Sequence, residues 1–267
     1  MININIDPTL FTLGPLVITW HGVFTAVGVL AGILLAVRLG AERGFNEDDI
    51  LSVALWSVIG GILGARFLHI VDQWGYYAQD PMAILRINEG GLAIFGSVVF
   101  GPLVGAIYSK WRGFSIPRLL DVGAAPLVLG MAIGRIGDII NGEHHGSPAG
   151  DFPLSVRYTH PNTLGEIDRP VHLAVGYEML LDLAIFAILM RVRWKLPYEG
   201  MMFWLFAALY SFGRFFVTFY RVDTIFAFNL TQAQVMSFLV GAAAVWVMVF
   251  QASRARKQSG AAQGSEP

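Results

Sequence analysis

The sequence has 267 residues, of which 55% are hydrophobic and 14% are charged, and its mean hydropathy is +0.59. These proportions exclude an ordinary soluble domain, so most of the chain must face lipid. A formal net charge of −1 provides no basic surface for nucleic acid, and the absence of cysteine excludes disulfides, thiolate metal sites and a thiol nucleophile of the chain's own.

The first fifteen residues contain no lysine or arginine. A cleaved signal peptide begins with a positively charged region. We therefore expect the N-terminus to be retained.

Seven segments are long and apolar enough to be transmembrane helices. A helix needs roughly 20 mostly apolar residues to cross about 30 Å of hydrocarbon. The segments are approximately residues 16–37, 51–70, 92–108, 119–140, 173–190, 201–220 and 235–250, of which the third is short and rich in glycine. The sequence therefore predicts an all-α integral membrane protein with about seven transmembrane helices.

One long polar stretch, residues 141–171, separates the fourth and fifth predicted helices. It is rich in glycine, proline, histidine and aspartate, which is typical of an ordered surface loop or a small cap. Residues 1–253 then form a single transmembrane domain that includes this insert. Residues 254–267 are polar and predict a disordered tail.

The positions of lysine and arginine predict the orientation of the chain. Positive residues cluster after the first, third, fifth and seventh predicted helices, whereas the other side carries few. The clusters are Arg38 and Arg43; Lys110, Arg112 and Arg118; Arg191, Arg193 and Lys195; and Arg254, Arg256 and Lys257. Because positive loops stay in the cytoplasm, we expect the N-terminus outside, the tail in the cytoplasm and the cap on the periplasmic or extracellular side.

Three arginines lie inside predicted spans: Arg66 in the second, Arg135 in the fourth and Arg214 in the sixth. An arginine at the centre of a spanning helix costs on the order of 2.5–3.5 kcal/mol, so each needs a partner or a function. With the orientation above, all three lie toward the outer half of the membrane. Their convergence would create an anion site, and a phospholipid phosphate is the first anion it would meet. Alternatively, each could snorkel to the interface or pair with a carboxylate.

The end of the fourth predicted helix has the densest group of polar residues, in the run from Gly134 to Gly146. Arg135 and Asp138 are three residues apart, so they share one face of the helix, and the glycines allow a ligand or another helix to approach closely. This combination is typical of a binding or catalytic site.

This run resembles the signature of the prolipoprotein diacylglyceryl transferase family, Gly-Arg-x-Gly-Asn-Phe-x-Asn-x-Glu. Further stretches resemble the family in the same order along nearly the whole chain. They are residues 14–22, 64–66, 89–96, 171–178 and 213–221.

The resemblance implies an enzyme of the bacterial cell (inner) membrane. It would transfer the diacylglyceryl group of phosphatidylglycerol to the lipobox cysteine thiol of a lipoprotein precursor and release glycerol phosphate, the first step of lipoprotein maturation. The nucleophile would come from the protein substrate, which agrees with a chain that contains no cysteine. The resemblance implies no metal and no cofactor, and its partners are phosphatidylglycerol, lipoprotein precursors and the membrane rather than nucleic acid.

The resemblance also implies roles for individual residues. Arg135 and Arg214 resemble the family's essential arginines, which would hold the phosphate and stabilise the departing phosphate ester. Asn141, Glu143 and Gly146 fall at signature positions, where they shape either the headgroup pocket or the helix end. The residues predicted to contact phosphatidylglycerol are Arg66, Arg135, Asp138, Asn141, Glu143 and Gly146.

Several positions depart from the family pattern. Phe95 stands where the family has a histidine, and a phenyl ring cannot accept a thiol proton. His21 replaces a tyrosine, Asp138 replaces the signature asparagine, and Thr218 replaces a common glutamate. The chain is then either a divergent enzyme in which another histidine handles the proton, or an inactive paralogue that binds or transports phospholipid. The histidines considered are His21, His144, His145 and His172, and we expect His21 to be the catalytic one.

Overall fold

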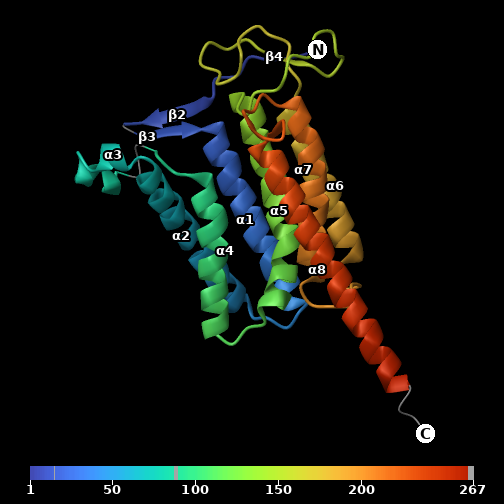
Figure 1. Cartoon of the computed structure of the whole chain (residues 1–267). Helices are drawn as coiled ribbons and strands as arrows, with labels where there is room; N and C mark the ends of the chain where they lie inside the picture. The colour runs from blue at the N-terminus through green and yellow to red at the C-terminus, as the bar shows by residue number, and fades with distance from the viewer. Residues whose placement is uncertain (15, 87–89, 264–267) are drawn as a thin grey trace. The chain divides into compact units, whose positions relative to one another are not determined.

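A computed structural model describes residues 1–14, 16–86 and 90–263, with the backbone alone described at residues 94 and 254–263 (Figure 1). Pro15 and Glu89, which belong to the family-like stretches above, lie outside the described residues. The chain divides into two compact units, Met1–Gly32 with Leu120–Pro267, and Ile33–Leu119. We describe each unit by itself.

The first unit contains the start of α1 (Trp20–Ala41) and four further long helices, α5 (Ile116–Asn141), α6 (Ala174–Val192), α7 (Met201–Val217) and α8 (Gln232–Gln263). A short 3-10 helix, η3 (Thr218–Tyr220), extends α7. α6 packs against α7 and α7 packs against α8.

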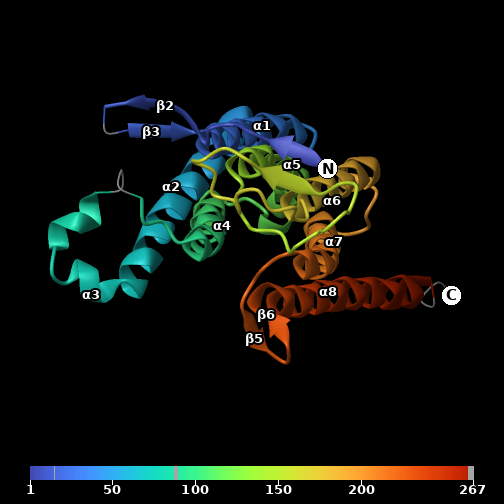
Figure 2. The ribbon, with the colours of Figure 1, turned by 90° about the horizontal axis from the view of Figure 1, so that it is seen from above.

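Short strands interrupt the helical pattern. β1 (Ile2–Ile4) pairs in parallel with β4 (Val156–Tyr158), β2 (Thr9–Leu13) pairs with β3 (Leu16–Thr19), and β5 (Ile225–Ala227) pairs with β6 (Leu230–Thr231), as Figure 2 shows from above. Our expectation of an all-α protein is corrected here, because the described chain is mostly rather than entirely helical. The first predicted helix began at Leu16, but residues 16–19 form β3 and the helix begins at Trp20.

The polar insert between α5 and α6 is an ordered cap, as predicted. β4 lies within it and joins the N-terminal strand β1. Val156, Tyr158 and Val171 are buried together in a small core, so the insert is held by packing as well as by strand pairing.

α5 and α7 have matching registers. The carboxylate of Asp121 in α5 accepts hydrogen bonds from the backbone N–H groups of Gly200, Met202 and Phe203, at 2.7, 2.8 and 3.1 Å, and so caps the start of α7. Arg135 follows Asp121 by 14 residues, and 14 residues likewise separate Gly200 from Arg214. Because this spacing is about 21 Å along both helices, the two arginines reach the same level.

The second unit is centred on α2 (Glu47–Asp72) and α4 (Ile94–Trp111), which pack along small residues. The Ser97 hydroxyl donates to the Gly61 carbonyl at 3.0 Å, and a Cβ at Gly60 would lie 2.6 Å from the Cβ of Val104. Glycine therefore allows the helix backbones to approach closely. The short helices α3 (Trp74–Tyr77) and η1 (Pro81–Leu85) follow α2.

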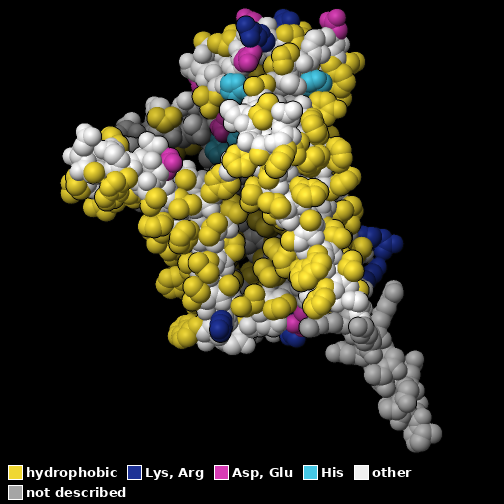
Figure 3. Space-filling model, in the orientation of Figure 1, with side chains coloured by type: hydrophobic (Ala, Val, Ile, Leu, Met, Phe, Trp, Pro, Cys, Tyr) yellow, Lys and Arg dark blue, Asp and Glu magenta, His cyan; other side chains and the backbone are white. Residues whose placement is uncertain are grey.

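Five helical segments are long and apolar enough to cross a membrane: Trp20–Ala41, Glu47–Asp72, Ile116–Asn141, Met201–Tyr220 and Gln232–Ser253. Hydrophobic side chains cover the exposed sides of the helices seen in Figure 3. α4 and α6 occupy the third and fifth predicted spans but are not among the five, and α6 carries Glu178, Asp182 and Arg191. The prediction of several membrane helices is confirmed, whereas seven crossings and the orientation remain predictions.

The C-terminal tail is helical for longer than the sequence predicts. α8 continues to Gln263, whereas the sequence predicts disorder from Arg254 onward. Residues 264–267 lie outside the described residues, so a separate disordered tail remains a prediction.

Candidate functional site

Glu178 is the centre of an arginine cluster in the first unit. This residue of α6 is fully buried. Its Oε2 lies 2.6 Å from an Nη of Arg135, and its Oε1 forms ion pairs with Arg214 and, at 3.3 Å, with Arg221. One carboxylate thus serves three guanidiniums. Three guanidiniums that converge on one carboxylate offer several N–H donors in a small space, so the cluster is suited to bind the oxygens of an anion.

The helix directions explain why these residues meet. Arg135 lies near the end of α5, Glu178 near the start of α6, and Arg214 near the end of α7. The cap joins the end of α5 to the start of α6, and the matched registers of α5 and α7 bring both arginines to this level.

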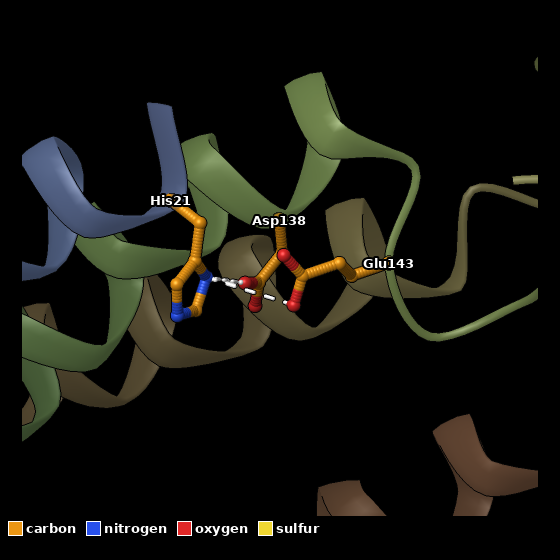
Figure 4. A group of neighbouring side chains, drawn as sticks. All are labelled: His21, Asp138 and Glu143. Carbon is orange, nitrogen blue, oxygen red and sulfur yellow. Dashed lines mark hydrogen bonds and ion pairs between the residues drawn. The ribbon is translucent and has the colours of Figure 1, made fainter. Parts of the chain in front are cut away.

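Arg135 also connects the cluster to a histidine. Its Nη1 donates to Oδ2 of Asp138 at 2.9 Å, and Oδ1 of Asp138 lies 2.5 Å from Nδ1 of His21 (Figure 4). An ionised carboxylate only accepts hydrogen bonds, so Nδ1 of His21 carries the hydrogen, and in the neutral imidazole Nε2 has the lone pair. The His21 side chain is 43% exposed, compared with 5% for Asp138. His21 therefore presents an oriented, accessible basic nitrogen.

The network continues into the start of the cap. The Asn141 amide donates to Oε1 of Glu143 at 3.0 Å, and Oε2 of Glu143 lies 3.7 Å from Nδ1 of His21. A pocket beside these groups is lined in part by Glu143, Gly146, Tyr158 and His172. Asn141 thus orients Glu143 between the histidine and this pocket.

The group His21, Asp138 and Glu143 could also hold a divalent cation, because one ligand atom from each lies within 4.8 Å of the others. The hydrogen bond between His21 and Asp138 would have to open to admit the ion. Asp138 would still have to share its charge with Arg135. A proton shared between His21 and Asp138 explains the arrangement without an ion.

His144 is a weak base in this setting. Burial, together with the nearby positive charge of Arg221, lowers the pKa of His144 to about 4. Its Nδ1 lies 3.4 Å from an Nη of Arg221. The Nδ1 of His172 lies 3.1 Å from the hydroxyl of Tyr177, within an aromatic group that includes Tyr220. Among the histidines considered from the sequence, His21 is the one that forms a hydrogen bond with a carboxylate in the described part of the chain, as in an acid–base dyad.

Arg66 has a different role from the one expected. In the second unit, its guanidinium donates to the backbone carbonyls of five residues, Ala83, Ile84, Arg86, Gly90 and Gly91, at 2.5–3.3 Å. A guanidinium has five N–H groups, so these carbonyls use its donors and leave none for a phosphate. In this conformation Arg66 holds the segment before α4, which corrects its assignment as a phosphate ligand.

The surroundings of three other positions in the family-like stretches can be described from the structure. Phe95 is 56% exposed on α4. The buried Thr218 hydroxyl donates to the carbonyl of Arg214 at 2.7 Å. Any side chain at Gly146 would collide with the peptide of His172, so glycine is required for this close packing. The geometry of Gly146 supports a structural role.

Sequence reasoning did not single out Glu178 and Arg221 as site residues. Glu178 lies in a family-like stretch and is an acid inside an apolar segment, which was the signal available for it. Arg221 ends the family-like stretch 213–221, and its charge was the signal available for it. Only the meeting of three helix ends shows that both belong with Arg135 and Arg214.

Comparison with known proteins gives a consistent result. The family described as "Prolipoprotein diacylglyceryl transferase" matches residues 8–250. The chain is 36% identical over 262 residues to "Phosphatidylglycerol--prolipoprotein diacylglyceryl transferase" of Dehalococcoides mccartyi, with 97% of each chain covered. It is 33% identical to the proteins of the same name from Bacillus licheniformis, covering 94% of this chain and 95% of the relative, and from Staphylococcus aureus, covering 92% and 89%.

Proposed function

The chain belongs to the prolipoprotein diacylglyceryl transferase family and transfers diacylglyceryl from phosphatidylglycerol to prolipoproteins, and we propose that it does so at the arginine cluster around Glu178. The observation that carries this assignment is one buried carboxylate shared by Arg135, Arg214 and Arg221 beside the His21–Asp138 pair.

The arginines bind the phosphate of the donor lipid. Arg135 and Arg214 are each 17% exposed at the side chain, so their guanidiniums are reachable although Glu178 is buried. A phosphodiester brings one negative charge and acceptor oxygens to these guanidiniums. When the ester bond breaks, additional negative charge develops on the phosphate, and the same guanidiniums stabilise it.

His21 accepts the proton of the cysteine thiol through Nε2. The sulfur then attacks the glycerol carbon that carries the phosphate ester, so a carbon–sulfur bond forms as the carbon–oxygen bond breaks. The electron pair of the broken bond leaves on the phosphate oxygen, and the imidazolium returns its proton to this leaving group. Asp138 stabilises the imidazolium while it carries that proton.

The pocket beside Glu143 is small, and Gly146 keeps its wall close to the His172 peptide. Asp138, Asn141 and Glu143 then contribute by orienting one another and His21. In this assignment they are mainly positioning residues.

The seven long helices cross the bacterial cell membrane with the N-terminus outside and the C-terminus in the cytoplasm. This orientation puts the cap and the arginine cluster at the outer leaflet. The support is the one-sided distribution of lysine and arginine in the loops.

A lipid-transfer assay tests the proposal. Purified protein in lipid nanodiscs is given labelled phosphatidylglycerol and a synthetic lipobox peptide, and diacylglyceryl thioether and glycerol phosphate are measured. We expect Arg135→Ala to lower transfer by about 10²-fold or more, because it removes charge stabilisation of the leaving group. Arg169→Ala is the matched control, since that arginine is 73% exposed and pairs with Glu166, three residues away in the cap.

Either of two results would contradict the assignment. Equal activity of Arg135→Ala and Arg169→Ala would remove the cluster from the reaction. Lipid binding without any transfer by the parent protein would instead support the non-catalytic phospholipid-binding alternative, in which Phe95 marks the lost base.

A further inference from the structure

The β5–β6 hairpin, Ile225–Thr231, exposes apolar side chains on both faces. Ile225 is 70% exposed and Phe226 is 65% exposed. Successive strand residues point to opposite faces, so each face of the hairpin carries an exposed apolar side chain, although both strands also contact α8. No charged residue occurs between Thr224 and Gln232. Such a surface is not suited to water on either side.

The turn of the hairpin carries an unusual residue. Phe228 and Asn229 join the two strands with φ values of 52° and 57°. Two-residue turns of this kind favour Asn-Gly, because positive φ is costly for a bulky side chain. Phe228 nevertheless occupies the first position and is 94% exposed. Packing within the protein does not account for phenylalanine here, so an external contact is the better explanation.

The place of the hairpin in the chain identifies that contact. It follows Met201–Tyr220 and precedes Gln232–Ser253, both long and apolar enough to span a membrane. With both helices in the membrane, the hairpin lies at the interface where the two spans end. Within the first unit, it projects sideways beyond the start of α8 (Figure 2). Its strands pair through Ile225 with Thr231 and Ala227 with Leu230, which satisfies backbone groups that lipid cannot.

The base of the hairpin is fixed to the functional site. Nε of Arg221 donates to Asp223 at 3.2 Å, and Nη1 of Arg221 contacts Glu178 at 3.3 Å. The backbone N–H of Val222 donates to the carbonyl of His145 at 3.0 Å. Any depth that the hairpin takes in the membrane is therefore transmitted to Arg221.

We propose that the β5–β6 hairpin inserts Phe226 and Phe228 into the lipid interface and holds Arg221 at the depth of the phospholipid phosphates. A bilayer is the occupant that fits, because fluid lipid can surround a projecting hairpin on both faces, whereas a protein partner would cover one. The lipid contact stands independently of the reaction. The effect on phosphate depth rests on the proposed function.

The chain's lack of cysteine allows a direct test by single-cysteine labelling. Phe228→Cys carries an environment-sensitive fluorophore, and the protein is placed in phosphatidylglycerol-containing nanodiscs with spin-labelled lipids. Phe212→Cys on α7, 69% exposed, is the lipid-facing reference, and Asp151→Cys in the cap is the water-facing reference. We expect Phe228→Cys to be quenched by the lipid-borne label and shielded from iodide, as Phe212→Cys is.

Two results would overturn the contact. One is iodide quenching equal to that of Asp151→Cys. The other is shielding that appears only when the lipobox peptide is added, which would identify a protein partner.

A second variant keeps the hairpin folded while removing its tip. Phe228→Asn with Asn229→Gly gives the favoured turn sequence, so loss of the aromatic ring is separated from loss of the hairpin. With Phe226→Ser added, we expect the apparent KM for phosphatidylglycerol to rise several-fold at unchanged kcat. If this variant has an unchanged KM although the hairpin of the parent is quenched by the lipid label, the hairpin does not set the depth of Arg221 at the phosphates. Absence of transfer in the parent with lipid quenching intact would count against the proposed reaction alone.

Discussion

At the scale of single residues, the site depends on the ion pairs that Glu178 forms with the arginines around it. Glu178 has almost no exposure and contacts three guanidiniums, so its removal would take away the carboxylate that pairs with Arg214 and one of the two that pair with Arg135. Breaking a buried ion pair in this way typically costs about 3–5 kcal/mol. Glu178 acts through the arginines and is a positioning residue.

Glu178→Gln should therefore lower transfer by roughly 10- to 100-fold, mainly by displacing Arg135 and Arg214. Asp182→Asn is a matched control, because Asp182 lies one turn further along α6, is equally buried, and has no hydrogen-bond partner for either oxygen among the described residues. The kinetic constants of both variants are measured together with Glu178→Asp, which should restore part of the activity. Equal losses in the two amide variants would contradict a special role for Glu178.

His21→Ala should lower transfer by about 10²- to 10⁴-fold, the range for loss of a general base. Binding of phosphatidylglycerol should persist because the arginines remain, and added imidazole should restore part of the rate. His160→Ala, a change of the same kind in the cap, should have little effect. Activity of His21→Ala close to that of the parent would assign the base to another residue.

His144 predicts a pH dependence of stability. Its pKa is about 4 in the folded protein, compared with 6.5 for the unperturbed group. As pH falls from about 6.5 to about 4, the unfolded chain binds a proton that the folded chain does not, so stability is full above this range and falls within it. Arg135, Arg214, Arg221 and Asp138 face the imidazole.

His144→Asn should reduce that dependence, since asparagine tolerates the positive φ of 58° and does not titrate. The measurement is Tm in nanodiscs at about pH 7.5 and about pH 5. The parent should lose more thermal stability between these values than the variant does. Equal losses of Tm in the parent and the variant would show that other groups control the decrease in stability at low pH.

At the scale of helices, the site depends on close approach of α1 and α5. Gly137 of α5 lies against the backbone of α1, where a Cβ would be 2.6 Å from the Cα of His21 and 2.9 Å from the Trp20 carbonyl oxygen. Further along the pair, a Cβ at Gly28 would lie 2.6 Å from the Gly130 carbonyl oxygen. These glycines allow the His21–Asp138 hydrogen bond to span two helices.

Gly137→Ala should separate α1 from α5 and lower both Tm and transfer. Gly134→Ala is its control in the same helix, because a Cβ there meets nothing within 4 Å. Alanine is favoured over glycine in a helix by up to about 1 kcal/mol, so Gly134→Ala should preserve or raise stability. Thermal unfolding and the transfer assay measure both variants, and similar behaviour of the two would argue against close contact at Gly137.

At the scale of the whole molecule, the orientation in the membrane decides which leaflet supplies the donor lipid. Asp151 is exposed in the cap, and Lys195 is exposed between α6 and α7. With the proposed orientation, these positions lie on opposite sides of the membrane.

Single-cysteine variants test this orientation. In intact cells, a membrane-impermeant maleimide should label Asp151→Cys, and it should label Lys195→Cys only after permeabilisation. The reverse pattern would place the arginine cluster at the inner leaflet. An odd number of crossings is tested by the same labelling at Asn5→Cys and Ser253→Cys, which should behave like the cap and the α6–α7 loop respectively.

Helices and family were predictable because their signals are local. The length of an apolar run can be compared with the thickness of a bilayer without knowledge of the rest of the fold. Six of the seven predicted spans accordingly lie mainly in single long helices, and the first does so from Trp20 onward. The signature around Arg135 and the stretch 213–221 are each continuous in sequence, and together they predicted the family and the two arginines nearest to Glu178.

Only the tertiary structure decided which charged side chains pair with one another. His21 and Asp138 are 117 residues apart, and Glu178 meets arginines from both sides of the sequence. Arg66 is a further example, because its partners are backbone carbonyls, and the sequence does not indicate which carbonyls a side chain will meet. The hydropathy of each helix determines that it enters the membrane. The pairing of the charges buried between helices depends on how the helices align lengthwise and how closely their backbones pack. Both of these depend on all the helices together.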